Sequence, residues 1–151
     1  MQRTIARALG MAVLISLVAG VAIAGASPKF ASTETIQFPG GNLVVTFDEG
    51  AQKRFSSVDY ELTATADATS CMTVDGVTQC IATRTQLSDT VSGLVPDDKG
   101  RVAGSLTLVA NAGPGGTICT CSLHMDYFDI TLTNLTSGHV YRLEPISADS
   151  P

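Results

Sequence analysis

Residues 58–80 read VDYELTATADATSCMTVDGVTQC, and they contain two local signals of β-structure. Its first half places apolar residues at every second position: Val58, Tyr60, Leu62, Ala64 and Ala66. A period of two is typical of a strand with one buried face. We therefore predict a strand here whose even-numbered residues point into a core.

Asp75-Gly76, near the end of the same stretch, predicts a hairpin. This dipeptide favours a two-residue type I′ turn, in which both residues have positive φ. Counting outward from the turn, Cys71 then faces Cys80 in a non-hydrogen-bonded pair. Such a pair holds its Cα atoms about 4.5 Å apart, within the range that a disulfide spans.

The four cysteines, Cys71, Cys80, Cys119 and Cys121, are expected to form disulfides, as is usual in exported chains with an even number of cysteines. A Cys71–Cys80 bond would leave Cys119 and Cys121 to form a strained ring with each other. We therefore favour the two crossed pairings, which join the hairpin cysteines to Cys119 and Cys121. The alternation of the strand argues against the crossed pairings. Cys71 has an odd number, whereas the residues expected to face inward, up to Ala66, have even numbers. Either a bulge follows Ala66, or Cys71 lies on the outer face and the local pairing gains weight.

Alternating runs recur on both sides of this hairpin, with apolar residues at Leu43, Val45 and Phe47, at Leu106, Leu108 and Ala110, at Phe128, Ile130 and Leu132, and at Tyr141 and Leu143. Turn-forming residues separate the runs, as in 96–100, 111–116 and 136–138. About eight short strands predict an all-β fold, either an antiparallel β-sandwich of immunoglobulin-like or related type, which we favour, or a small barrel. The predicted core contains Phe47, Leu62, Leu108, Ile130 and Leu132.

The N-terminal residues 1–26 have the pattern of a secretory signal peptide. Arg3 and Arg7 precede an apolar run over 11–23, and small residues end at Ala26. The run is shorter than the ~20 residues that a membrane-spanning helix needs. We expect cleavage after Ala26 and a secreted product that does not associate with membranes.

The rest of the chain, 27–151, is expected to form a single domain with loose ends at 27–33 and 147–151. The full sequence of 151 residues carries 9 Lys and Arg against 14 Asp and Glu, a net charge of −5. An acidic surface repels phosphate backbones, which argues against nucleic-acid partners. The length also argues against a multidomain enzyme.

Residues with catalytic or metal-binding chemistry are sparse. There are two histidines, His124 and His139, and no nucleophile elbow or comparable signature. The run from Cys119 through Cys121 to His124 has donors that suit zinc or copper. In a regular strand, however, the cysteines and His124 would point to opposite faces. We therefore predict no metal, no cofactor and no catalytic residues.

Two loops are candidate binding elements, because a rigid scaffold can present variable loops. Their residues are Asp97, Asp98 and Lys99 in one loop and Asn111 and Gly115 in the other. Asn134-Leu-Thr136 matches an N-glycosylation acceptor, and whether it is used is left open.

The chain resembles a group of small secreted bacterial all-β proteins of uncharacterised function. The resemblance is carried by residues 62–66, 99–106 and 128–135, by Cys71 before a turn, and by a Gly/Pro-rich loop leading to Cys119. It implies export and a β-sandwich, and it transfers no catalytic or binding residue. Cys80 and Cys121 look additional to a one-bridge pattern of Cys71 with Cys119, which implies crossed pairing.

Together these observations favour a secreted, non-catalytic β-sandwich domain that binds an extracellular protein or an envelope component, or has a structural role there. Two alternatives remain. One is a small secreted hydrolase built around His124 or His139. The other is a cysteine-based metal or redox module.

Overall fold

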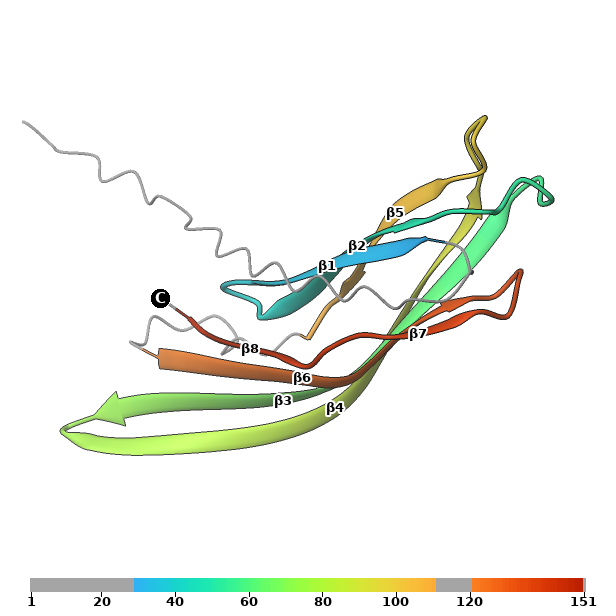
Figure 1. The fold of residues 1–151 in the computed structure, drawn as a ribbon. Helices are drawn as coiled ribbons and strands as arrows, with labels where there is room; N and C mark the ends of the chain where they lie inside the picture. Colours follow the sequence, from blue (N-terminus) through green and yellow to red (C-terminus); the bar gives the residue numbers. More distant parts are fainter. Residues whose placement is uncertain (1–28, 111–120, 151) are drawn as a thin grey trace, which may run out of the picture.

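The computed structural model describes residues 29–110 and 121–150, which fold into two antiparallel β-sheets (Figure 1). The smaller sheet has the order β1-β2-β5, with β1 at Phe30–Gln37, β2 at Asn42–Glu49 and β5 at Val102–Leu108. The larger sheet has the order β4-β3-β6-β7, with β4 at Val77–Leu94, β3 at Val58–Val74, β6 at Cys121–Asn134 and β7 at Val140–Arg142. β8, at Ile146–Asp149, also pairs with β6. This architecture confirms the predicted all-β sandwich.

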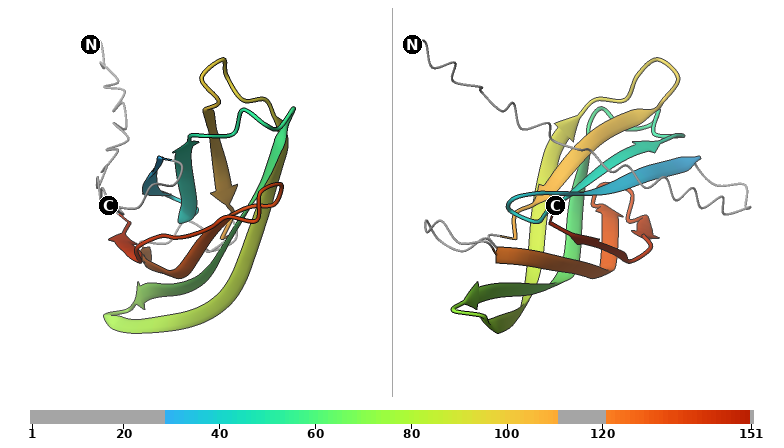
Figure 2. Two further views of the ribbon diagram at one scale, coloured as in Figure 1. Left: turned by 45° about the vertical axis from the view of Figure 1, so that its right-hand side comes forward. Right: turned by 90° about the vertical axis from the view of Figure 1, so that its left-hand side faces the viewer.

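The core lies between the two sheets, which face one another in Figure 2. All five residues predicted to form it are buried: Phe47, Leu62, Leu108, Ile130 and Leu132. Each belongs to an alternating run, so its side chain points to the face of its strand that packs against the other sheet. Replacing a buried leucine with alanine typically costs about 2–5 kcal/mol, so these positions hold much of the stability of a small domain.

The β3–β4 hairpin confirms the predicted turn and register. Asp75 and Gly76 both have positive φ, at 51° and 77°. Val74 pairs with Val77, and Cys71 pairs with Cys80. The register runs without interruption from Tyr60 to the turn, so even-numbered residues of β3 face the core side throughout.

One residue of the predicted inward set, Phe128, lies on the outer face instead. The pairing of β3 with β6 shifts between Thr63 and Thr65, opposite Asp129, which has a φ of +52°. This β-bulge reverses the alternation of β6. Ile130 and Leu132 are buried on one side of it, whereas on the other side the buried residues are odd-numbered: Leu123, Met125 and Tyr127.

The two ends predicted to be loose are largely strands. β1 begins at Phe30, which pairs with Glu49 and stacks on Tyr141 with 3.8 Å between ring centroids. β8 occupies most of the C-terminal end and pairs with His124–Tyr127. Backbone pairing and the aromatic contact order both ends. The predicted signal peptide, residues 1–26, lies outside the described residues, and no helix within those residues is long and apolar enough to cross a membrane.

The tip of the β3–β4 hairpin projects past the other described strands (Figure 1). We call residues 67–84 the arm, and the remainder of the two strands, 58–66 and 85–94, the base. The base contributes Tyr60 and Leu62 to the core. The arm extends the larger sheet beyond the region that the smaller sheet covers.

Candidate functional site

A carboxylate is buried between the two sheets at the end of β2. Glu49 is 0% exposed, and its oxygens accept hydrogen bonds from Tyr60 Oη at 2.6 Å, from Asn134 Nδ2 at 2.8 Å and from Tyr141 Oη. The His139 imidazole lies 3.2 Å away and is half-exposed. Glu49 comes from the smaller sheet and its partners come from β3, β6 and the β7 region, so the network ties the sheets together.

This network was missed from the sequence, although one signal was available. Glu49 has the same parity as Leu43, Val45 and Phe47, which places it on the buried face of β2. Burial raises the pKa of Tyr60 and of Tyr141 above the ordinary range, and the bonds to Glu49 raise both further. The two hydroxyls therefore stay protonated and donate to the carboxylate. Because several donors already surround it, Glu49 acts as a structural acceptor.

The same network holds the asparagine of the predicted glycosylation motif. The Asn134 side chain is buried, and its nitrogen donates to Glu49. Its Oδ1 accepts from the backbone N–H groups of Thr136 and Ser137, at 3.0 and 2.9 Å. An amide held in this way is not available to a glycosyltransferase in the folded protein.

His124 lies on the outer face, between β6 and β8. Its Nδ1 is 2.7 Å from Asp149 Oδ1, and its Nε2 is 3.1 Å from Asp126 Oδ2. The hydrogen bond to Asp149 and the nearby charge of Asp126 raise the pKa of His124. Across the described residues, no group of three His, Cys, Asp or Glu side chains is arranged to hold a metal ion.

A hollow of about 360 Å³ opens on the larger sheet near the bulge. It is lined by Thr63, Ala64, Thr65, Gln86, Leu87, Ser88 and Asp129. Asp129 is the single titratable residue in this lining, and neither histidine belongs to it. The structure thus brings neither of the predicted hydrolase histidines to the hollow.

The loop predicted at Asp97, Asp98 and Lys99 is exposed, but one of its carboxylates is already engaged. Asp97 Oδ1 accepts from the backbone N–H groups of Arg101, at 2.8 Å, and Lys99, at 2.9 Å. The bond from Arg101 is the main cause of a lowered Asp97 pKa. Asp97 therefore shapes the turn, which leaves Asp98 and Lys99 facing solvent. Asn111 and Gly115, in the second predicted loop, lie outside the described residues.

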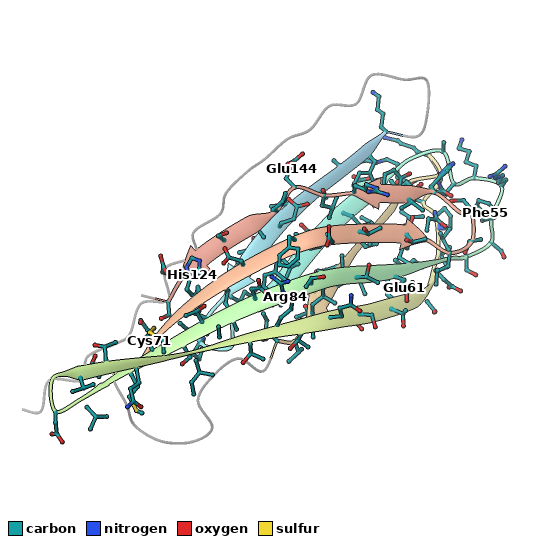
Figure 3. The ribbon with its side chains drawn as sticks, turned by 90° about the horizontal axis from the view of Figure 1, so that it is seen from below. Phe55, Glu61, Cys71, Arg84, His124 and Glu144 are labelled. Atoms are coloured by element: carbon teal, nitrogen blue, oxygen red, sulfur yellow. A yellow bond between two sulfur atoms is a disulfide. The ribbon has the colours of Figure 1, made fainter. Side chains whose placement is uncertain are left out.

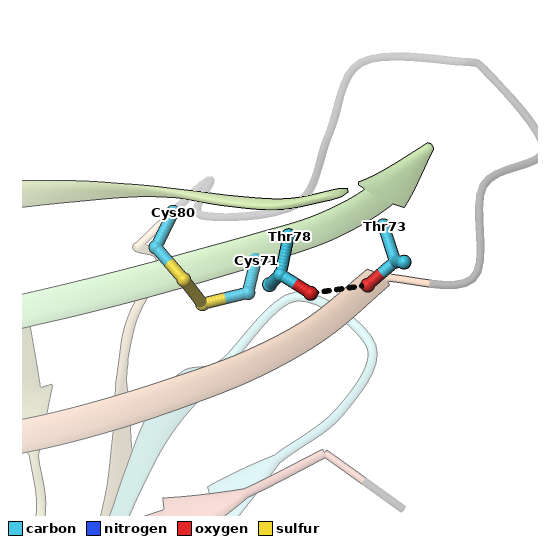
Figure 4. Close-up of a disulfide and its surroundings, with 4 residues drawn as sticks. All are labelled: Cys71, Thr73, Thr78 and Cys80. Carbon is cyan, nitrogen blue, oxygen red and sulfur yellow. Dashed lines mark hydrogen bonds between the residues drawn. A yellow bond between two sulfur atoms is a disulfide. The ribbon is translucent and has the colours of Figure 1, made fainter. Parts of the chain in front are cut away.

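The structure corrects the favoured crossed disulfides, because Cys71 is bonded to Cys80, with 4.0 Å between their Cα atoms (Figure 4). No bulge separates Ala66 from Cys71 along the β3–β4 pairing, so Cys71 keeps its odd-numbered position on the outer face. The non-hydrogen-bonded pairing then places the two sulfur atoms together. Cys119 lies outside the described residues, and the backbone of Cys121 pairs with Met72.

The arm carries a cluster of exposed apolar side chains. They are Met72 (39% exposed), Val74 (54%), Val77 (61%) and Ile81 (72%). In the observed register Val74 faces Val77 and Ile81 faces Ser70, so all four lie on the core-side face. These four side chains give the arm an exposed apolar stretch on that face.

The opposite face of the arm is polar and cross-linked. Figure 4 shows the disulfide beside a 2.8 Å hydrogen bond between the hydroxyls of Thr73 and Thr78. Closer to the base, Arg84 pairs with Asp67 through two hydrogen bonds and lies over the Phe128 ring. Figure 3 shows Cys71 and Arg84 on the larger sheet. These contacts hold the arm in its hairpin geometry.

The arm also has an open edge, because β4 is the terminal strand of the larger sheet. Val74 and Val77 flank a two-residue turn and form a hydrogen-bonded pair, so odd-numbered residues of β4 bond to β3. The even-numbered residues from Thr78 to Ser88 therefore direct their backbone N–H and C=O groups outward. Among the described residues no strand or side chain pairs with these groups, whereas the next outward N–H, that of Thr90, is bonded to Asp89 Oδ1 at 2.9 Å.

No protein-family model matches the sequence, and a search of curated proteins finds no match.

Proposed function

We propose that this protein is an extracellular, non-catalytic recognition module that binds a protein partner by adding a strand to the β4 edge of the arm. The observation that carries this proposal is the coincidence of an unpaired strand edge and an apolar face on the same hairpin. In strand addition, backbone hydrogen bonds supply affinity and alternating side chains supply specificity. The arm provides both.

The composition of β4 supports a binding role for its edge. Exposed edge strands are commonly protected by lysine, by proline or by very short length. β4 spans 18 residues and contains neither lysine nor proline. Its charged residues are Arg84, which is paired with Asp67, and Asp89, which lies in the base. Such an edge is a template for an incoming strand.

The disulfide supports this proposal in two ways. A bond of this kind persists in oxidising compartments, which agrees with an extracellular location and with the predicted signal peptide. It also fixes the hairpin before a partner arrives, and preorganisation lowers the entropy cost of binding. The expected partners are therefore extracellular or envelope proteins with an extended segment that has apolar residues at every second position.

The observed clusters give the alternatives less support. Glu49 is surrounded by donors that serve the packing of the two sheets, which weakens the case for a Glu49–His139 hydrolytic pair. Cys71 and Cys80 are joined to each other, so they do not supply thiolate ligands to a cysteine-based metal module.

Selection of short peptides on the mature secreted protein tests the proposal. A displayed random library is selected on the wild-type protein, and each enriched peptide is then measured against Ala82→Pro and Ala82→Ser. Proline at position 82 removes one outward N–H and leaves the β3 ladder intact, whereas serine keeps that N–H.

Enriched peptides are expected to have a period of two, to bind Ala82→Ser like the wild type, and to lose at least about tenfold in affinity for Ala82→Pro. A selection that enriches no such peptide would contradict the proposal. So would a set of peptides that binds the proline and serine variants equally.

A further inference from the structure

We infer that the strand accepted by the β4 edge is the β4 strand of a second copy of this chain. The two β4 strands run antiparallel across a two-fold axis that passes through Ile81, so the two larger sheets become one continuous sheet. This inference rests on the proposed function, since it names the partner of the same edge. Three observations carry it.

The first observation is the match of the free backbone groups. A two-fold axis perpendicular to a sheet pairs each residue with one of the same parity. The outward-directed groups of β4 all belong to even-numbered residues, from Thr78 to Ser88. Each even residue of one copy therefore meets an even residue of the other, and each free N–H finds a free C=O.

The second observation is the set of side chains that the axis at Ile81 brings together. Ile81 has the most exposed side chain of the apolar cluster, and here it faces its own copy in a non-hydrogen-bonded pair, in which side chains approach most closely. The flanking pairs in this register are Cys80 with Ala82, Gln79 with Thr83, Thr78 with Arg84 and Val77 with Thr85. None of these pairs places two like charges opposite each other, which would be destabilising.

The third observation is the distribution of charge. The chain carries a net charge of −5, so two copies repel one another over most approaches. Between Asp67 and Arg84 the single charged residue is Asp75, which lies in the turn. The segment of β4 from Val77 to Thr83 carries no charged residue, so two copies can meet along this edge without opposed carboxylates.

The shape of the hairpin permits this pairing. The tip of the arm projects past the other described strands, so an antiparallel pair of arms places the two sandwiches at opposite ends of the joint. The paired segment runs from Val77 to Thr85, which begins at the turn and ends where the base starts. The tip of each arm then reaches the base of the other.

Analytical ultracentrifugation of the mature secreted protein over a wide concentration range tests the inference. Wild type and Ala82→Ser are expected to dimerise, and Ala82→Pro to remain monomeric. Ile81→Lys places two ammonium groups at the axis and should raise the dissociation constant by about 100-fold or more. Thr69→Lys, on the outer face of β3 in the same arm, is the matched charge control and should dimerise like the wild type.

Mixed-isotope NMR of the wild-type dimer tests the register. A contact between the Ile81 methyl groups of a labelled and an unlabelled copy is expected, and a dimer without it would overturn the register. Amide protection of residues 70–74 in Ala82→Pro and Ile81→Lys shows that the arm still folds, so that a monomeric variant is not simply unfolded.

A wild-type protein that is monomeric at all concentrations would overturn the inference. If peptides selected on that monomer still bind in a way that Ala82→Pro abolishes, the proposed function survives and its partner is another protein. A dimer that Ala82→Pro leaves unchanged would overturn the inference as well.

Discussion

The base and the arm of the β3–β4 hairpin share the same two strands and, from Tyr60 to the turn, one unbroken register, yet their apolar side chains lie in opposite environments. Leu62, in the base, is fully buried beneath the smaller sheet, whereas Ile81, in the arm, is largely exposed on the same face of the larger sheet. Alternation of apolar and polar residues thus decides which face a residue occupies. Burial depends on whether a second sheet covers that face.

The largest expected difference between base and arm comes from shortening one apolar side chain in each region. Leu62→Ala should lower the free energy of unfolding by about 2–5 kcal/mol, because it leaves a cavity in the core. Val77→Ala, on the same face of the arm, should change it by less than about 0.5 kcal/mol. Chemical denaturation at a concentration that keeps the protein monomeric measures both values. Equal losses would mean that the arm is packed as tightly as the base.

The second contrast concerns polar contacts. Glu49→Ala leaves the buried hydroxyls of Tyr60 and Tyr141 and the Asn134 amide without their acceptor, and should cost about 3 kcal/mol or more. Thr73→Val breaks the exposed hydrogen bond between the hydroxyls of Thr73 and Thr78 in the arm, and it should cost less than about 0.5 kcal/mol. Thermal unfolding compares the two. A small loss in Glu49→Ala would show that the sheets do not depend on this network.

The third contrast separates local from global stability. Replacing Cys71 and Cys80 together with alanine should cost at most about 3 kcal/mol in the chain-entropy view of a short loop. Because most of the arm lies outside the core, we expect hydrogen exchange to accelerate mainly over 67–84, with little change at buried residues of the base. Uniform acceleration across both regions would argue that arm and base unfold as one unit.

The smallest expected effect is a pH dependence of the pairing between β8 and β6, beside the arm. The pKa of His124 is raised in the folded protein, mainly by its hydrogen bond to Asp149. Protonated His124 therefore stabilises this pairing fully below the ordinary histidine pKa of about 6.5, and the effect is lost as pH rises through the raised value. The half-exposed imidazole limits the gain to less than about 1 kcal/mol.

Hydrogen exchange of residues 146–149 against pH, in wild type and His124→Gln, measures this effect. Protection in the wild type should fall as the pH rises through the raised pKa of His124, whereas His124→Gln should show no such step. A step that persists in the glutamine variant would assign the effect to another group.

Much of the fold could be predicted because its signals are local. The alternation from Val58 to Ala66 and the Asp75-Gly76 turn are both contained in short stretches, and the register of the hairpin followed from them. The bulge at Asp129 could not be predicted, since Asp129 continues a regular alternating run and its positive φ leaves no trace in the pattern. The position of Phe128 was wrong for this reason.

The candidate site was harder to predict because it depends on which segments of the chain pack against one another in the folded protein. Parity put Cys71 on the outer face, but the strain expected for a Cys119–Cys121 ring was given more weight, and the crossed pairing that resulted was wrong. The sequence also offered no sign that the smaller sheet would stop short of the arm. That termination, and not any motif, leaves Ile81 exposed, whereas the β4 edge is open because β4 is the terminal strand of the larger sheet.

The Cys71–Cys80 bond also separates the turn from everything behind it. Nothing lies within 4 Å of the position that a Cβ atom on Gly76 would occupy, so the turn touches no other part of the described molecule at that point. A foreign loop grafted between Asp75 and Gly76 would be held at its stem by a covalent clamp. The hairpin could therefore serve as a display scaffold, in which an inserted epitope varies freely while the strands that carry it keep their alignment.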